Sequence, residues 1–592
     1  MSKIIIIGAG LGGLYTANRL INEGIHPDNI VLIDRRSGIY TRPGHIKKST
    51  FSKVQEKTGI DTSDHSPACH IKELERFMYT SLQSKGCLFL NETFIGMKPG
   101  EASQECGVIT VASDGIQHIY PASYVYDCSG KTGIVARAVN EYQQKQNLDK
   151  VFVSRPLVDI NPIPDHLIAQ IIIADPNSIK NFYNLSSANP VPSYYKRHKS
   201  AEQSIATREA LQDLGWHYDA FPTFYVHSRE AKGKVCAYME APHDLSDAKQ
   251  SEWVNLLLGI YSNGRISSYT PLKSPVKYET KPRIEGFTNE IHVLNRATFK
   301  SNALPAVLVG FDALKGTDYR SASGVDSGID CFEIMLKHTK INKGTIETID
   351  FKSIEDEVFM FIDGLYRSDL TVLQQSRQQS IYNGHNYFSH LYESAATKLS
   401  SSDSIKKKHY THIAARLAVQ AASARFTAFE SRETEDPLTS LEILNKCLKS
   451  LIRVQSLLPA NETEEYYQNN ERIQKVIQSI RLELDLLDLD SLLAGESSHI
   501  QRLSRFCKRL KQNFSSLMGN FAFNTIQKKI SNMESCINRQ PEDLNKVINQ
   551  QTSLYSSSQL TSDASPYSST FFQAPDTVFV RESCSSSATL RF

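Results

Sequence analysis

The sequence lacks long apolar runs, and this absence limits what the chain can be. None of its 592 residues falls in an apolar run approaching the roughly 18 residues that a membrane-spanning helix requires, so no transmembrane segment is predicted. A surplus of one charge is also lacking, since 66 Lys and Arg face 64 Asp and Glu. A net charge of +2 is far from the basic surplus of a nucleic-acid-binding chain. We therefore expect no nucleic-acid partner.

The ten cysteines are scattered, and none forms a CxxC pair. This spacing argues against a zinc ribbon or a thioredoxin-type site, so no metal site is predicted. Scattered cysteines suit a reducing compartment. The apolar run Ile4–Ile7 is too short for a signal peptide, and we expect a cytoplasmic protein. The GxSxG and HExxH motifs of hydrolases are absent as well.

The most informative segment is a glycine loop near the N-terminus. The isoleucine strand Ile4–Ile7 leads into Gly8, Gly10 and Gly13, which form GxGxxG. Gly8 permits a tight turn, Gly10 lets a pyrophosphate approach the backbone, and Gly13 lets the next helix pack on the strand. Asp34 ends the following apolar strand 21 residues after Gly13, near the spacing of about 20 expected of a ribose-binding acid. The context predicts a dinucleotide, NAD or FAD, bound at the helix N-terminus.

Two later segments help to decide between NAD and FAD. The strand-like run Tyr124–Gly130 ends at Asp127 and a turn of small residues. The buried-type strand within Ala306–Ala313 ends in a second acid, and a glycine-rich helix start, Gly324–Gly328, follows it. No second GxGxxG occurs, which argues against a reductase with separate FAD and NADPH domains.

With these segments, the chain resembles FAD-dependent monooxygenases of the p-hydroxybenzoate hydroxylase-like superfamily, including the flavin domain of the MICAL actin oxidases. The resemblance covers about residues 1–340 and implies a bound FAD with NADPH or NADH as the reductant. It also implies the cofactor-binding residues, which are Gly8, Gly10, Leu11, Gly12, Gly13, Asp34, Arg35, Arg42, Asp127, Gly130, Asp312, Gly324 and Val325.

In the resemblance, the glycine loop holds the pyrophosphate of FAD, and Asp34 binds the adenosine ribose. Asp312 matches the family's acid on the ribityl chain, and the helix start at Gly324 faces the isoalloxazine ring. The sequence departs from the family at three points. Phe311 separates Gly310 from Asp312, which are usually adjacent in the family, and the Pro common in the following loop is missing from Ala313 to Gly324. The family's Asp-Gly fingerprint appears only as the run Asp127–Gly130.

The order of segments predicts an α/β protein with an inserted domain. A Rossmann-type FAD-binding domain is expected over residues 1–150 and 300–345, and a β-rich substrate-binding domain over 151–299. Strand-like runs at 223–227 and 234–239 favour a sheet that covers the reactive ring of the cofactor.

The remaining residues follow a helical pattern. Apolar residues recur at helical spacing in the segments 441–458, 473–487 and 503–517, which predicts an all-α helical bundle within 350–550. The bundle is either a scaffold or a module that targets a partner protein or a membrane. The Ser-rich segment 551–592 is expected to be disordered.

The resemblance implies a monooxygenase or hydroxylase that works through a flavin C4a-hydroperoxide on a small molecule or a protein side chain. No catalytic residue is predicted, because the cofactor performs the difficult step. A flavin-dependent reductase or halogenase-like enzyme is one alternative, and a non-catalytic FAD-fold protein that binds a partner is another. The layout is also similar to effectors that intracellular bacteria secrete into host cells. His45 either lines the flavin or substrate site or lies on the surface.

Overall fold

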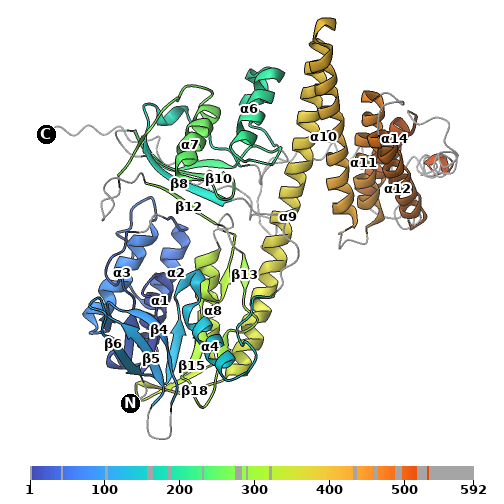
Figure 1. Ribbon diagram of the computed structural model, residues 1–592. Helices are drawn as coiled ribbons and strands as arrows, with labels where there is room; N and C mark the ends of the chain where they lie inside the picture. The colour runs from blue at the N-terminus through green and yellow to red at the C-terminus, as the bar shows by residue number, and fades with distance from the viewer. Residues whose placement is uncertain are drawn as a thin grey trace, which may run out of the picture. The chain divides into compact units, whose positions relative to one another are not determined.

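The structure is a computed structural model whose chain divides into two units (Figure 1). Unit 1 comprises Met1–Pro176, Val226–Asp244 and Ser268–Gln374, and unit 2 comprises Asn177–Tyr225, Leu245–Ser267 and Gln375–Phe592. The described residues are 3–41, 44–100, 105–155, 165–183, 190–229, 233–273, 283–288, 291–318, 323–430, 436–458, 464–486, 497–515, 528 and 530–532. Arg42 and the tail 551–592, both named in the sequence predictions, lie outside these residues.

A six-stranded sheet forms the centre of unit 1, in the order β14-β15-β7-β1-β2-β3. Its strands are β1 (Ile4–Ile7), β2 (Ile30–Ile33), β3 (Leu88–Leu90), β7 (Tyr124–Asp127), β14 (Thr298–Phe299) and β15 (Ala306–Val309). All neighbouring pairs are parallel except β14 with β15. The isoleucines of β1 are at most 1% exposed, as expected of a strand covered on both faces. The carboxyl ends of β1, β2, β7 and β15 therefore meet at one edge of the sheet.

Helices cover this sheet. They are α1 (Leu11–Asn22), α2 (Lys48–Thr58), α3 (Ile71–Ser84), α4 (Ile134–Lys145) and α8 (Gly324–Lys337). The helix α1 connects the parallel strands β1 and β2 and packs against α2, α3 and α8. The predicted α/β fold class, with a parallel sheet that begins at the glycine loop, is confirmed.

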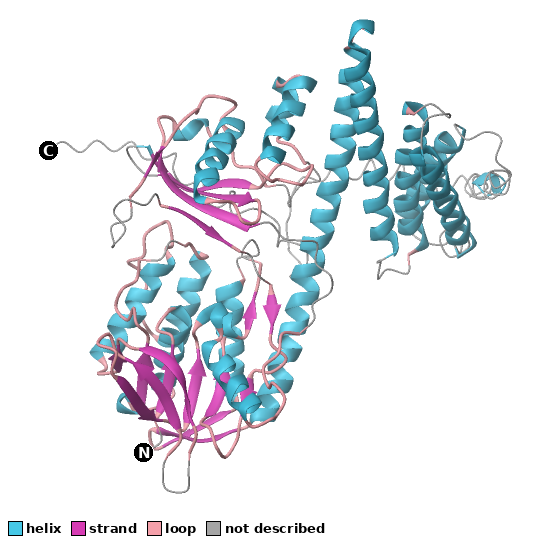
Figure 2. Cartoon of the chain, in the orientation of Figure 1, coloured by secondary structure: helices cyan, strands magenta, loops and turns pink. Residues whose placement is uncertain are grey.

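Unit 1 also contains antiparallel strands (Figure 2). One sheet contains β4 (Thr93–Lys98), β5 (Gly107–Val111) and β6 (Gln117–Pro121), and another contains β8 (Asp165–Ile172), β9 (Phe224–Arg229), β10 (Lys234–Ala241), β11 (Thr270–Pro271) and β12 (Ile284–Phe287). Two-stranded pairs are formed by β13 (His292–Val293) with β16 (Lys315–Gly316) and by β17 (Thr339–Asn342) with β18 (Thr345–Ile349). The domain limits expected from the sequence, 151–299 among them, stay predictions.

The longest helix, α9 (Phe351–Lys398), begins in unit 1 and ends in unit 2. The other helices of unit 2 are α5 (Ser193–His198), α6 (Ala201–Asp213), α7 (Asp247–Tyr261), α10 (Ser404–Glu430), α11 (Pro437–Leu457), α12 (Glu464–Leu486) and α14 (Ser497–Ser515). Short 3-10 turns are η1 (Pro27–Asn29), η2 (Gly130–Thr132), η3 (Pro176–Ser178), η5 (Phe311–Ala313) and η7 (Ser401–Asp403). Among the described helices, none has both the length and the apolar character needed to cross a membrane.

A buried apolar cluster joins α10, α11, α12 and α14. Apolar residues from all three of the segments 441–458, 473–487 and 503–517 belong to this cluster. Among them are Leu441, Leu448, Ile477 and Phe506, each at most 3% exposed. Burial of these side chains at helical spacing explains why the segments fold as amphipathic helices. The full extent of the expected bundle, 350–550, stays a prediction.

A buried charged cluster in unit 2 is built around Asp219. Its carboxylate is 4% exposed and forms ion pairs with Arg208 of α6 and with His385 of α9. Arg208 also donates to the hydroxyl of Tyr392 at 3.3 Å. Burial alone would raise the pKa of Asp219, but the hydrogen bond to His385 and the charge of Arg208 hold that pKa below its ordinary value.

Removing this charge should strongly destabilise unit 2. Asp219→Asn leaves Arg208 buried without a counter-ion, and we expect a loss of about 3–5 kcal/mol in the free energy of unfolding at pH 7, measured by urea denaturation. Because the folded-state pKa of Asp219 is depressed, the stabilisation is present above its unfolded value and is lost as the pH falls through the folded one. The exposed Asp213, replaced by Asn, is the control and should change stability by less than about 0.5 kcal/mol. Equal effects of the two variants would contradict the role of the cluster.

Candidate functional site

The loop between β1 and α1 is held by close contacts at two glycines. A Cβ at Gly8 would lie 2.3 Å from the carbonyl oxygen of Cys128, and a Cβ at Gly13 would lie 1.9 Å from the carbonyl oxygen of Gly8. Gly8 also has a φ of +101°, in the region that favours glycine. The first turn of α1 therefore packs directly on the end of β1, as the GxGxxG pattern predicts.

The N-terminus of α1 has no side-chain cap. Gly10 is the N-cap residue. A Cβ at Gly10 would meet only Oε1 of Glu75, at 3.7 Å. Leu11 and Gly12 lie in the first turn of α1, where amide groups without partners in the helix and the helix dipole favour an anion. The geometry fits the pyrophosphate of a dinucleotide.

Asp34 lies beside the glycine loop at the end of β2. Its Oδ2 accepts a hydrogen bond from the backbone N–H of Ala9 at 3.0 Å, and its Oδ1 accepts one from the backbone N–H of Arg36 at 2.9 Å. The side chain is 14% exposed, so the carboxylate is fixed but still reachable from solvent. Arg35, named from the sequence, is exposed, whereas Nε of the neighbouring Arg36 lies 3.7 Å from the Asp34 carboxylate. A fixed acid at this place fits a ribose hydroxyl group.

Asp127 is fully buried at the end of β7, and its carboxylate accepts hydrogen bonds from other residues of the protein. Its Oδ1 accepts hydrogen bonds from the backbone N–H and the hydroxyl of Ser129, and its Oδ2 accepts from the backbone N–H groups of Val135 and Ala136 at 3.1 and 3.0 Å. Burial raises the pKa of Asp127 in spite of these bonds. The carboxylate thus fixes the turn before α4. The cofactor contacts expected of Asp127 and of Gly130, which has a φ of +74°, stay predictions.

The turn η5 after β15 holds a phenylalanine in an unusual position. Phe311 has a φ of +53°, and its ring is 8% exposed. A Cβ at Gly12 and a Cβ at Gly328 would each come within 2.6 Å of this ring, so the ring lies between α1 and the start of α8. The adjacent Asp312 is exposed, and its backbone carbonyl accepts a hydrogen bond from His292 at 3.1 Å.

Two sets of contacts hold α8 against its neighbours, one in its C-terminal half at Glu333 and one in its first turn at Asp326. Glu333 of α8 accepts hydrogen bonds from Nε of Arg19 at 2.8 Å and from the hydroxyl of Tyr15 at 2.6 Å, which ties α8 to α1. Asp326 accepts a hydrogen bond from the hydroxyl of Thr50 at 2.7 Å, which ties α8 to α2. Gly324 and Val325, named from the sequence, form the first turn, and no side chain caps it. The structure therefore brings a second helix N-terminus next to the glycine loop.

The structure places His45, named from the sequence, in a cluster of histidines and a tyrosine in unit 1 whose other members the sequence did not predict. The ring centroid of His45 lies 3.4 Å from that of His227 and 4.5 Å from that of His70. Nδ1 of His45 lies 3.0 Å from the hydroxyl of Tyr238. Nε2 of His45 is buried and has no hydrogen-bond partner among the described residues. No local sequence pattern predicts this cluster, because His45 and Tyr238 are 193 residues apart.

The environment of His45 keeps its imidazole neutral. Burial lowers the pKa of His45 to about 2, and the neighbouring His227 and His70 contribute to the shift. Burial also lowers the pKa of His227. A neutral imidazole with one buried nitrogen can accept or donate a single hydrogen bond to a ligand.

Comparison with known proteins finds likeness in shape and none in sequence. No family profile and no curated protein matches the chain. The solved structures that match include monooxygenases and a hydroxylase. One is p-nitrophenol 4-monooxygenase from Pseudomonas putida, with 12% identity and a TM-score of 0.33 over 72% of this chain and 96% of that one.

A second match is aklavinone-11 hydroxylase in complex with FAD and aklavinone, with 13% identity and a TM-score of 0.36 over 57% of this chain and 62% of that one. A third is a flavoprotein/dehydrogenase from Cytophaga hutchinsonii, with 10% identity and a TM-score of 0.39 over 70% of this chain and 92% of that one. Since these TM-scores are below 0.5, we base the interpretation of the site on its own geometry.

The contact between Gly13 and Gly8 can be tested by adding one methyl group. Gly13→Ala forces its Cβ against a backbone oxygen, and we expect a loss of about 3 kcal/mol or more in the free energy of unfolding, measured by urea denaturation. Gly364→Ala in α9 is the matched control, because no atom lies within 4 Å of its Cβ. It should stabilise the protein by about 1 kcal/mol. A harmless Gly13→Ala would show that the loop does not need the close approach.

The neutral state of His45 has a consequence for the pH dependence of stability. Its folded-state pKa is lowered, so between pH 7 and pH 5 the unfolded chain binds the proton first, and acid favours unfolding. Over this interval His45→Phe should remove about 2 kcal/mol of the acid-induced loss of stability. Tyr238→Phe keeps the imidazole and should leave the pH dependence unchanged. The measurement is urea denaturation at each pH, and identical pH profiles of His45→Phe and the wild type would refute the assignment.

Proposed function

We propose that unit 1 binds FAD and that the protein is an FAD-dependent monooxygenase or hydroxylase. The observation that carries the proposal is the uncapped N-terminus of α1 above Gly10, with the Asp34 carboxylate fixed beside it. This pairing suits a dinucleotide, because the first binds phosphates and the second binds a ribose. FAD is favoured over NAD by the resemblance of residues 1–340 to flavin monooxygenases.

Different residues of the site would bind different parts of FAD. The amide groups at Leu11 and Gly12 would bind the pyrophosphate, Asp34 would accept hydrogen bonds from the adenosine ribose, and Asp312 would face the ribityl chain. The N-terminus of α8 at Gly324 would place its partial positive charge near the flavin ring. When bound, FAD would supply electron transfer from NADPH or NADH and the activation of O2.

Residues of the protein itself would form the substrate-binding site. We propose that His45 Nε2 meets a polar group of the substrate, because it is buried and lacks a partner among the described residues. The neutral imidazole would orient such a group without adding charge. The substrate is a small molecule or a protein side chain.

One observation favours a second candidate function, a non-catalytic FAD-fold protein that binds a partner. Phe311 stands directly after Gly310, where the related enzymes carry an Asp, and its ring fills the space between Gly12 and Gly328. The two candidates differ in redox chemistry. A monooxygenase reoxidises its flavin in air and consumes NADPH or NADH in the presence of its substrate, whereas a flavin that dithionite cannot reduce would favour the second candidate.

The purified protein should be yellow, and Asp34 should set its affinity for FAD. Removing a carboxylate that binds a ribose costs about 1.5–3 kcal/mol, so Asp34→Ala should weaken FAD binding by about ten- to a hundredfold. The measurement is flavin fluorescence during titration of the apoprotein. Asp28→Ala removes an exposed charge six residues before Asp34 in the chain and should not change the affinity. Colourless protein that FAD cannot reconstitute would overturn the proposed function.

A further inference from the structure

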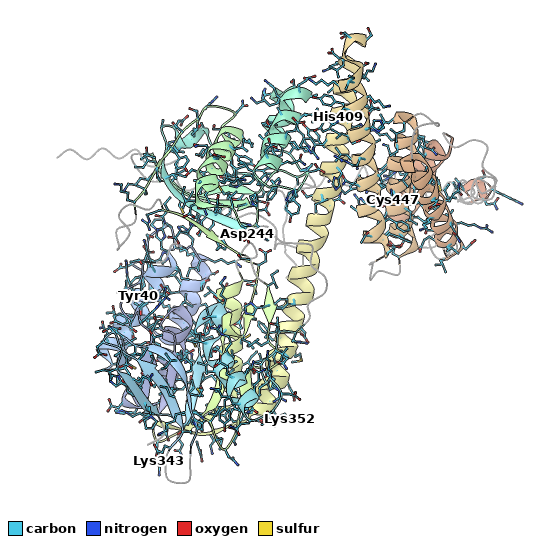
Figure 3. The ribbon with its side chains drawn as sticks, in the orientation of Figure 1. Tyr40, Asp244, Lys343, Lys352, His409 and Cys447 are labelled. Carbon is cyan, nitrogen blue, oxygen red and sulfur yellow. The ribbon has the colours of Figure 1, made fainter. Side chains whose placement is uncertain are left out.

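Four basic side chains of unit 2 lie on three helices that pack together. We call them the basic ridge: Arg425 of α10, Lys446 and Lys449 of α11, and Arg509 of α14. The helix α14 itself contains no Asp or Glu between Ser497 and Ser515. Figure 3 labels Cys447, the α11 residue that follows Lys446 in the chain.

Arg425 is the least solvated member of the basic ridge. Its guanidinium carbon lies 3.9 Å from the centroid of the Tyr382 ring, in a cation–π contact. Its Nε is buried and has no hydrogen-bond partner among the described residues. Burial lowers the pKa of Arg425, which means that the protein destabilises the charged form. A desolvated guanidinium without a carboxylate is costly, and an anion would relieve that cost.

The lysines of the basic ridge lie one turn apart on the exposed face of α11. Lys446 is close enough to other cations to be affected by them. Burial lowers the pKa of Lys446, and the charges of Arg425 and Arg509 lower it further, while Glu442 opposes the shift. The helices α10 and α14 both pack against α11, so these three like charges lie on neighbouring helices, at a cost to the folded state.

The nearby acids already form ion pairs, and two of the three cations that they pair with lie outside the basic ridge. Glu442 lies 3.2 Å from Nε of Arg502 and 3.8 Å from Arg509, and Glu393 pairs with Arg453. In the part of the chain that the structure describes, no carboxylate forms an ion pair with Arg425 or with either lysine of the basic ridge. The ridge therefore keeps an excess of positive charge where its helices meet.

We propose that the basic ridge binds a ligand that carries clustered phosphate groups. Guanidinium groups bind phosphate oxygens in a bidentate manner, and lysines add point charges around them. Several cations from separate helices can be satisfied together by neighbouring phosphates, whereas one carboxylate satisfies one or two of them. A soluble polyphosphate and a phosphorylated lipid headgroup share this chemistry. The site is independent of the proposed flavin function, so a colourless protein would leave it unaffected.

The test measures binding of two probes to the full-length protein. Calorimetry with inorganic tripolyphosphate reports the soluble source, and co-sedimentation with phosphatidylcholine vesicles, with or without phosphatidylinositol 4-phosphate, reports the lipid source. Lys446→Gln and Arg509→Gln should each weaken binding by about tenfold, the loss of one charge-assisted hydrogen bond. Lys407→Gln removes an exposed charge near the other end of α10 and should leave binding unchanged.

A second readout separates ligand binding from a structural role. Because Lys446 is repelled by its neighbours, Lys446→Gln should raise Tm while it weakens binding. Arg425→Lys keeps the charge but loses the planar fork, so it should weaken binding of both probes. Binding of neither probe, an equal effect of Lys446→Gln and Lys407→Gln, or binding of a DNA oligonucleotide without binding of either phosphate probe would each overturn the proposal.

Discussion

The contact between the first turn of α1 and the end of β1 is the constraint on which the candidate site depends. With 1.9 Å between a Cβ at Gly13 and the carbonyl oxygen of Gly8, only glycine can stand at position 13. The close approach puts the N-terminus of α1 at the sheet edge where β1, β2 and β7 end. Asp34 reaches the same edge because β2 lies beside β1 in register, Ile7 opposite Ile33. One backbone contact thereby sets both the phosphate-binding and the ribose-binding parts of the site.

The position of the second helix, α8, depends on side chains rather than on backbone. Arg19 and Tyr15 of α1 converge on Glu333 of α8, and burial together with this carboxylate raises the pKa of Tyr15 far above its ordinary value. Thr50 of α2 meets Asp326 near the start of the same helix. The helix dipoles of α1 and α8 are thus fixed in one region, which suits a long ligand with charge at two places.

Local spacing explains what the sequence could predict, and distance along the chain explains what it could not. The glycine loop, Asp34 and the α/β class follow from periodicity and from glycine positions within about 35 residues, and the structure places them together. The histidine cluster joins residues 45, 70, 227 and 238, and no local pattern links such positions. The sequence also could not show whether Arg35 or Arg36 lies beside the Asp34 carboxylate, because the direction of each side chain depends on the turn after β2. The sequence also could not show that the Asp127 carboxylate accepts hydrogen bonds from backbone N–H groups around the turn before α4.

Phe311 links positions that are far apart in the sequence. Its ring fills the volume that side chains at Gly12 and Gly328 would need, so the three residues form one packing unit. A lineage that replaced Phe311 by a small residue would leave a cavity of nearly ring size between two helices, and a larger residue at position 12 or 328 could then fill it. In an alignment of relatives, these three positions should therefore coevolve, with small residues at two of them accompanying a large residue at the third.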